Sequence, residues 1–122
     1  MTRSRRELEA ARFLADGGFA AQAVSRAYYA AFYAAEEALL ALDETRSKHS
    51  GVLAAFERLV VREGGVDPVS GRRLRSLFRR RNEADYGAVP ASRKEADEAV
   101  RDAEYVVDAI ESWLADRRGR HA

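Results

Sequence analysis

The sequence contains no cysteine, and only two prolines and two histidines among its 122 residues. The absence of cysteine excludes disulfides, thiolate nucleophiles, cysteine-ligated zinc and iron–sulfur clusters. The two histidines, His49 and His121, are too far apart in the sequence to form a local two-histidine metal motif. We therefore expect no metal site and no cofactor.

Long hydrophobic runs are also missing. The uncharged run Ala27–Ala35 is far shorter than the roughly 20 apolar residues that a membrane-spanning helix needs. The first residues are rich in arginine and lead into Glu7 and Glu9 without an apolar signal segment. We therefore expect a protein that neither spans a membrane nor is exported, and the expected location is cytoplasmic.

The composition is that of a folded protein. Hydrophobic residues make up 47% and charged residues 34%, and the formal net charge is +1. This is enough apolar material for a core, and the length is typical of one domain. We expect residues 1–122 to form a single domain.

Glycine and proline mark the connecting segments, at 16–18, 64–71 and 87–91, and a polar stretch at 43–50 marks another. No segment alternates apolar and polar residues with a period of two, so strands are not expected. The predicted helices span 3–15, 19–42, 50–62 and 70–85. The fifth begins after Ser92, with Glu95 in capping-box position, and ends near residue 117. These segments predict an all-α, up-and-down antiparallel bundle of four main helices plus a short additional N-terminal helix.

The predicted helix 19–42 is apolar around most of its circumference, which is typical of a central helix. One stripe along it carries polar groups as well as rings. That stripe consists of Ser25, Tyr29, Phe32 and Glu36. The hydroxyl groups at Ser25 and Tyr29 are candidates to line a cleft, although a bundle can also satisfy them internally.

Positive charge is concentrated in the fourth predicted helix. Six arginines lie between residues 72 and 81 with no acidic residue among them, whereas the fifth predicted helix is rich in Asp and Glu. Pairing between these two helices is one interpretation, and an anion-binding surface is the other. Arg72, Arg75 and Arg79 follow three- and four-residue spacing, so they form one face that could bind the phosphates of a nucleotide or RNA.

The core stripe of the same helix runs into charged residues. Leu74 and Leu77 are followed, one and two turns later, by Arg81 and Asp85. A buried arginine must be paired, or must face a cavity or a partner. The structural interpretation is an ion pair of Arg81 with Asp85, or a bridge from Arg81 to Glu36, that closes the end of the bundle.

Three segments of the sequence together resemble the HEPN superfamily of small helical bundles. They are Ser-Arg-Ala-Tyr-Tyr-Ala-Ala-Phe-Tyr-Ala-Ala-Glu-Glu-Ala-Leu-Leu at 25–40, Lys-His-Ser-Gly-Val at 48–52 and Arg-Asn-Glu-Ala-Asp-Tyr-Gly at 81–87. The segments occur in the order typical of the family and cover the second to fourth predicted helices.

The resemblance implies a site around Arg81. Many HEPN proteins are metal-independent RNA endonucleases whose motif is an arginine, a polar residue and, a few positions later, a histidine, placed at a dimer interface. Arg81 and Asn82 match the first two positions, and Tyr86 stands where the histidine is expected. A phenol with a pKa of about 10 is a poor general base at neutral pH. His49, from another helix, is the remaining candidate for the missing imidazole.

The resemblance also implies partners. It predicts a homodimer that binds RNA or a nucleotide and works with a nucleotidyltransferase, as family members in toxin–antitoxin-like pairs do. The first alternative is an active metal-independent RNA endonuclease that uses Arg81. The second is a purely structural helical module for dimerisation or as an adaptor, in which Arg81 is neutralised internally.

Overall fold

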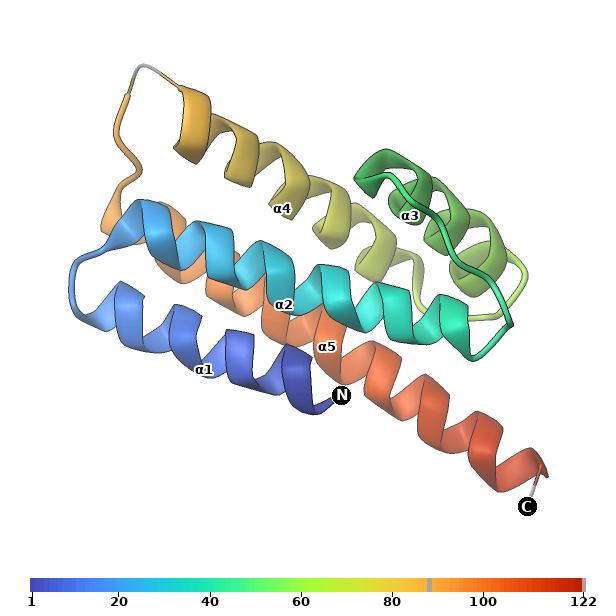
Figure 1. The fold of residues 1–122 in the computed structure, drawn as a ribbon. Coiled ribbons are helices and arrows are strands. Elements are labelled where there is room, and N and C mark those ends of the chain that lie inside the picture. The colour runs from blue at the N-terminus through green and yellow to red at the C-terminus, as the bar shows by residue number, and fades with distance from the viewer. Residues whose placement is uncertain (88, 122) are drawn as a thin grey trace.

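The computed structural model describes residues 1–87 and 89–121, with side chains as far as Arg120. This part of the chain is built from helices and connecting turns, without a strand. The elements in chain order are α1 (Thr2–Asp16), α2 (Ala20–Leu40), α3 (His49–Ala55), the π-helix η1 (Phe56–Arg62), α4 (Pro68–Tyr86) and α5 (Arg93–His121). The long helices lie side by side with short connections (Figure 1), which confirms the predicted all-α bundle.

The helix α2 lies at the centre and packs against every other helix. Its sequence explains this position, because small side chains let neighbouring helices approach closely from several sides. Ala27, Ala30, Ala31 and Ala34 are fully buried. Tyr28 is the largest fully buried side chain and carries a polar hydroxyl into this core. A buried phenol needs a hydrogen-bond partner, and the partner of Tyr28 belongs to the candidate site.

The ends of the helices follow local signals. Gly18 has φ +86°, and the N–H of Phe19 donates to the carbonyl of Leu14, which is a Schellman ending of α1. Asp43 has φ +57°, and the N–H of Glu44 after it donates to the carbonyl of Leu39, which ends α2 in the same way. The helix α2 ends at Leu40 and not at the predicted residue 42. The predicted capping box is present, because the N–H of Glu95 donates to Ser92 Oγ and the N–H of Ser92 donates to Glu95 Oε1.

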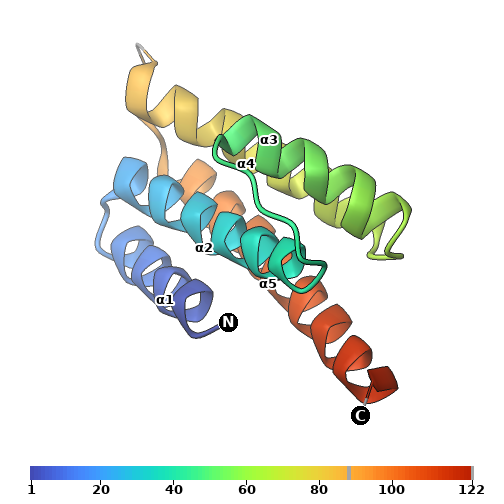
Figure 2. The ribbon, with the colours of Figure 1, turned by 45° about the vertical axis from the view of Figure 1, so that its right-hand side comes forward.

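The predicted helix 50–62 consists of two types of helix. Its first half, α3, is followed directly by η1, in which the hydrogen bonds span one residue more than in an α-helix. Phe56, Val60 and Val61 are all buried, and the wider π-helical turn places residues four and five positions apart on one side. Figure 2 shows α3 and η1 alongside α4, on the side of the bundle away from α1.

Ion pairs connect α1 to α5 along the opposite side of the molecule. Arg5 donates to Glu111 and Asp108 at 2.8 and 2.9 Å, and Arg12 donates to Glu104 at 2.6 Å. No described helix is long and apolar enough to cross a membrane.

Candidate functional site

The arginines of α4 divide into groups with different surroundings. Arg73 and Arg80 face α5, where Arg73 donates to Asp102 and Arg80 donates to Glu98, both at 2.8 Å. Asp102 also lies 4.0 Å from Nε of Arg80, and its side chain is only 16% exposed. The predicted pairing between α4 and α5 is therefore present, and it involves Arg73 and Arg80.

The three arginines predicted to bind an anion lie on another face of α4. Arg72, Arg75 and Arg79 are all exposed. Arg75 donates to Glu57 of η1 at 2.8 Å. For Arg72 and Arg79 there is no ion pair with any residue that the structure describes. Two of the three guanidinium groups are thus available to a phosphate without breaking an internal contact.

Arg81 faces α2 instead of α5. Its Nε lies 3.0 Å from Asp85 Oδ2, and its side chain is 21% exposed. Its Cζ lies 5.9 and 5.6 Å from the ring centroids of Tyr28 and Tyr29. Glu36, the other predicted partner, is not within ion-pair distance of Arg81 in the described structure. Both terminal nitrogens of Arg81 lack a hydrogen-bond partner among the described residues, so the ion pair with Asp85 leaves binding capacity unused.

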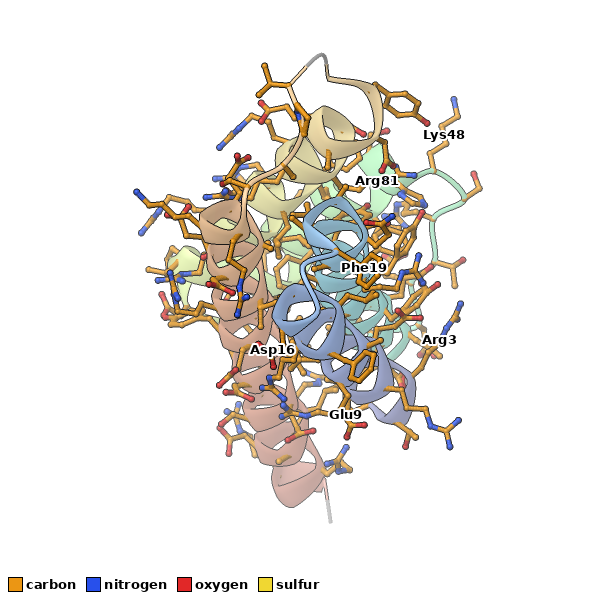
Figure 3. The ribbon with its side chains drawn as sticks, turned by 90° about the vertical axis from the view of Figure 1, so that its left-hand side faces the viewer. Arg3, Glu9, Asp16, Phe19, Lys48 and Arg81 are labelled. Carbon is orange, nitrogen blue, oxygen red and sulfur yellow. The ribbon has the colours of Figure 1, made fainter. Side chains whose placement is uncertain are left out.

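His49 lies against the same pair of tyrosines. Its Nδ1 is 2.8 Å from the hydroxyl oxygen of Tyr28, and its ring stacks on Phe32 with the centroids 4.2 Å apart. Its ring and the ring of Tyr29 are nearly perpendicular, with the centroids 5.9 Å apart. The structure therefore brings together His49 from the start of α3, Tyr29 from α2 and Arg81 from α4. In the view of Figure 3, Arg3 of α1, Lys48 of the loop before α3 and Arg81 of α4 lie on the same side of the bundle.

The hydroxyl group of Tyr28 is neutral in the folded protein. Burial raises the pKa of Tyr28 well above its ordinary value, and the nearby Arg81 guanidinium offsets only part of this effect. A neutral hydroxyl has one hydrogen to donate, and leaving that hydrogen without an acceptor in the core would cost about 1–3 kcal/mol. Within the described structure His49 Nδ1 is its one hydrogen-bond partner.

Ser25 lies in a neighbouring hollow. With Arg26, Asp85 and other residues it lines a depression of about 510 Å³ between α2 and the end of α4. Arg26 donates to Glu7 of α1 at 3.1 Å, and its Cζ lies 5.1 Å from the ring centroid of Tyr29. Sequence reasoning did not single out Arg26. The signal was present, because Arg26 and Tyr29 are three residues apart on a helix.

Asn82 and Tyr86 lie on a different side of α4. Together with Phe78 and Arg79 they line a shallow hollow of about 480 Å³, and Tyr86 is 79% exposed. Tyr86 follows Arg81 by five positions, which is roughly 140° around an α-helix. The structure thus places Asn82 and Tyr86 at a hollow that Arg81 does not line, whereas His49 and Arg81 both lie against Tyr28 and Tyr29.

The part of the chain that the structure describes contains no cluster of three or more His, Asp or Glu side chains that could hold a metal ion. The side chain of His121 lies outside the described residues.

The fold and site define a class: a small helical bundle in which a half-buried arginine and a histidine flank a tyrosine pair on the central helix. The family model of the HEPN domain matches residues 1–113. The chain belongs to the HEPN family.

Similar proteins occur in bacteria and archaea. A protein of Thermotoga maritima named "UPF0332 protein" is 39% identical over 115 residues, which cover 93% of this chain and 87% of that protein. "Putative toxin MJ0605" of Methanocaldococcus jannaschii is 34% identical, with 89% of this chain and 81% of that protein covered. "Putative toxin MJ0142" of the same organism is 32% identical, with 79% and 65% covered.

Proposed function

We propose that this protein binds RNA or a nucleotide and that Arg81 is the centre of its binding site. The observation that carries the proposal is the position of the Arg81 guanidinium, which lies over two tyrosine rings with both terminal nitrogens unpartnered in the described structure. A guanidinium in this state can form two parallel hydrogen bonds to one phosphate.

The surroundings of Arg81 fit a nucleic-acid ligand. Tyr29 is half-buried and presents part of an aromatic ring next to the cation, which suits the stacking of a base. Arg72 and Arg79 form a second positive surface, on another face of the same helix. A ligand with several phosphates, such as single-stranded RNA, would contact these arginines in addition to Arg81 only by passing around α4.

The proposal includes a toxin-like role with protein partners. Two relatives bear the name toxin, and membership of the HEPN family supports an RNA-related or nucleotide-related activity. The nucleotidyltransferase partner is proposed on the family resemblance alone.

A homodimer is also proposed. Support comes from the exposed large apolar side chains Phe13 and Phe19 near the α1–α2 turn and Tyr86 and Val89 near the α4–α5 connection. These two connections lie at the same end of the bundle (Figure 1). Light scattering should give the mass of a dimer at micromolar concentration, and a monomeric mass would contradict this part of the proposal.

The central test is the binding of a labelled single-stranded RNA, measured by fluorescence anisotropy at low salt. Arg81→Ala should weaken binding about tenfold or more, because it removes charge-assisted hydrogen bonds to a phosphate. Arg12→Ala is the matched control, because Arg12 forms an ion pair with Glu104 between α1 and α5. This variant should bind RNA with unchanged affinity. Equal affinity of all three proteins would show that Arg81 is not the site. No binding by any of them would favour the structural adaptor.

RNA cleavage is a second candidate function, favoured by the position of His49 and Arg81 beside the same two tyrosines. Cleavage should then persist in EDTA and be lost in Arg81→Ala, because the guanidinium would stabilise the charge of the transition state. A cleavage reaction that requires added magnesium, or that survives Arg81→Ala, would contradict this function.

A further inference from the structure

The imidazole of His49 is held in one orientation from two sides. The hydroxyl of the fully buried Tyr28 bonds to Nδ1, and the ring of Phe32 stacks on the face of the imidazole. The hydrogen-bonding capacity of Nδ1 is therefore used by a core residue. Nε2 has no hydrogen-bond partner among the described residues, and His49 as a whole is half-buried at the surface.

The direction of the hydrogen bond to Tyr28 follows from the surroundings of the phenol. Nδ1 of His49 is the only acceptor that the described structure offers to this buried hydroxyl. Because the phenol keeps its hydrogen, Tyr28 donates and Nδ1 accepts. A neutral imidazole that accepts at Nδ1 carries its hydrogen on Nε2.

We infer that Tyr28 is a positioning residue that fixes His49 as the Nε2–H tautomer, and that this N–H donates to a phosphate oxygen of the ligand beside Arg81. The inference rests on the proposed function and goes further, because it assigns His49 to binding rather than to proton abstraction. An imidazole whose Nδ1 accepts from Tyr28 and whose Nε2 carries hydrogen has no free lone pair for a 2′-hydroxyl proton. As a donor, it complements the unpartnered terminal nitrogens of Arg81.

The charges around the imidazole suit an anion. Arg81 of α4 and Arg26 of α2 both lie over the ring of Tyr29, which also packs against His49. Lys48 directly precedes His49 and is exposed. Asp85 and Glu7 neutralise part of this charge through their contacts with Arg81 and Arg26. The terminal nitrogens of Arg81 stay open to a ligand despite the contact with Asp85.

The tautomer can be measured in the free protein. Nitrogen-15 NMR of the imidazole at neutral pH should show hydrogen on Nε2 and a lone pair on Nδ1 of His49. Tyr28→Phe, which removes only the hydroxyl, should allow the tautomer with hydrogen on Nδ1 to become populated as well, because Nδ1 then no longer has a hydroxyl to accept from. A spectrum of the unmodified protein with hydrogen on Nδ1, or one that Tyr28→Phe leaves unchanged, would overturn the inference whatever the protein binds.

Two substitutions separate the two nitrogens of the imidazole in the RNA-binding measurement. His49→Gln places an amide nitrogen near the position of Nε2 and should retain most of the affinity. His49→Asn reaches only the position of Nδ1 and should bind about tenfold more weakly, the effect expected for one lost hydrogen bond to a charged group. Thermal unfolding of both variants checks that the fold is intact.

The outcomes distinguish this inference from the proposed function. If Arg81→Ala weakens RNA binding but His49→Asn does not, the proposed function stands and the role of His49 is wrong. If both His49 variants bind normally but neither cleaves RNA that the unmodified protein cleaves, His49 is an acid–base group and the inference is overturned. If the unmodified protein binds no RNA, the proposed function fails and the phosphate contact of His49 fails with it.

Discussion

Arg80 and Arg81 are neighbours in the sequence, but they lie on two sides of α4 with different chemistry. On the side that faces α5, Arg80 meets the carboxylates of Glu98 and Asp102. On the side that faces α2, Arg81 lies over Tyr28 and Tyr29 and has a single carboxylate partner in its own helix. The two side chains are about equally exposed, at 23% for Arg80 and 21% for Arg81.

The difference shows that burial alone does not distinguish an arginine whose charge is neutralised by another helix from one whose hydrogen-bonding capacity is partly unused. On the α5-facing side the charges are balanced by carboxylates of another helix, so the contact holds two helices together. On the α2-facing side the hydrogen-bonding capacity of Arg81 exceeds what its surroundings use.

The unpaired arginines of α4 should control the salt dependence of RNA binding. Arg72→Ala combined with Arg79→Ala should flatten the slope of log affinity against log salt by about 1.4, because each phosphate contact on a single strand contributes about 0.7. Affinity at low salt should fall roughly tenfold or more. The measurement is anisotropy over a salt series.

Arg73→Ala is the matched control, since Arg73 is bound to Asp102. An equal change of slope in Arg73→Ala and in the double variant would show that an arginine paired with α5 contacts RNA as well as an unpaired one does. It would contradict the distinction between the two groups of arginines.

Asp102→Ala should have the largest effect on stability along the α5-facing side. It leaves two partly buried guanidinium groups, Arg73 and Arg80, without their shared carboxylate. We expect the free energy of unfolding to fall by about 1–3 kcal/mol. Urea denaturation followed by circular dichroism measures this.

Asp108→Ala removes an exposed partner of Arg5 and should cost less than about 1 kcal/mol. If Asp102→Ala is no more destabilising than Asp108→Ala, the α5-facing side is not held together as the structure indicates.

A smaller effect is expected from pH, at the ion pairs between α1 and α5. Hydrogen bonds from Arg5 lower the pKa of Glu111. Because the pKa is lower in the folded than in the unfolded protein, Glu111 stabilises the fold above its ordinary pKa. This contribution disappears as the pH falls from about 4.5 through the folded value.

Both groups are more than one third exposed, so the contribution should stay below about 1 kcal/mol. Unfolding measured over a pH series should show the unmodified protein and Arg5→Ala differing at neutral pH and converging in acid. A difference that stays constant into strong acid would mean that Arg5 acts through packing and not through Glu111.

Local patterns predicted most of the fold, because they depend on short-range physics. The glycines after α1 and the capping box of Ser92 and Glu95 marked helix ends correctly, since a cap needs only a few neighbouring residues. The π-helix η1 had no such signal. Its wider turn depends on packing Phe56, Val60 and Val61 together in the core.

The candidate site was less predictable. Arg81 stood out because it interrupts a core stripe, and the structure indeed places it partly inside the molecule. The family motif pointed to Asn82 and Tyr86, and the structure places both at a hollow that Arg81 does not line, so their role in the site stays a prediction. The contact of His49 with Tyr28 joins residues 21 positions apart, and no periodicity within one helix reports such a contact.

The sequence by itself determined that this protein is an α-helical bundle with an alanine-rich central helix, because periodicity, caps and turn residues act over a few positions. The tertiary structure alone decided which arginines are neutralised and which nitrogen of His49 is committed to the core. Those outcomes depend on which side chains of distant segments meet, and a guanidinium or an imidazole takes its role from the groups that lie within hydrogen-bond distance of it.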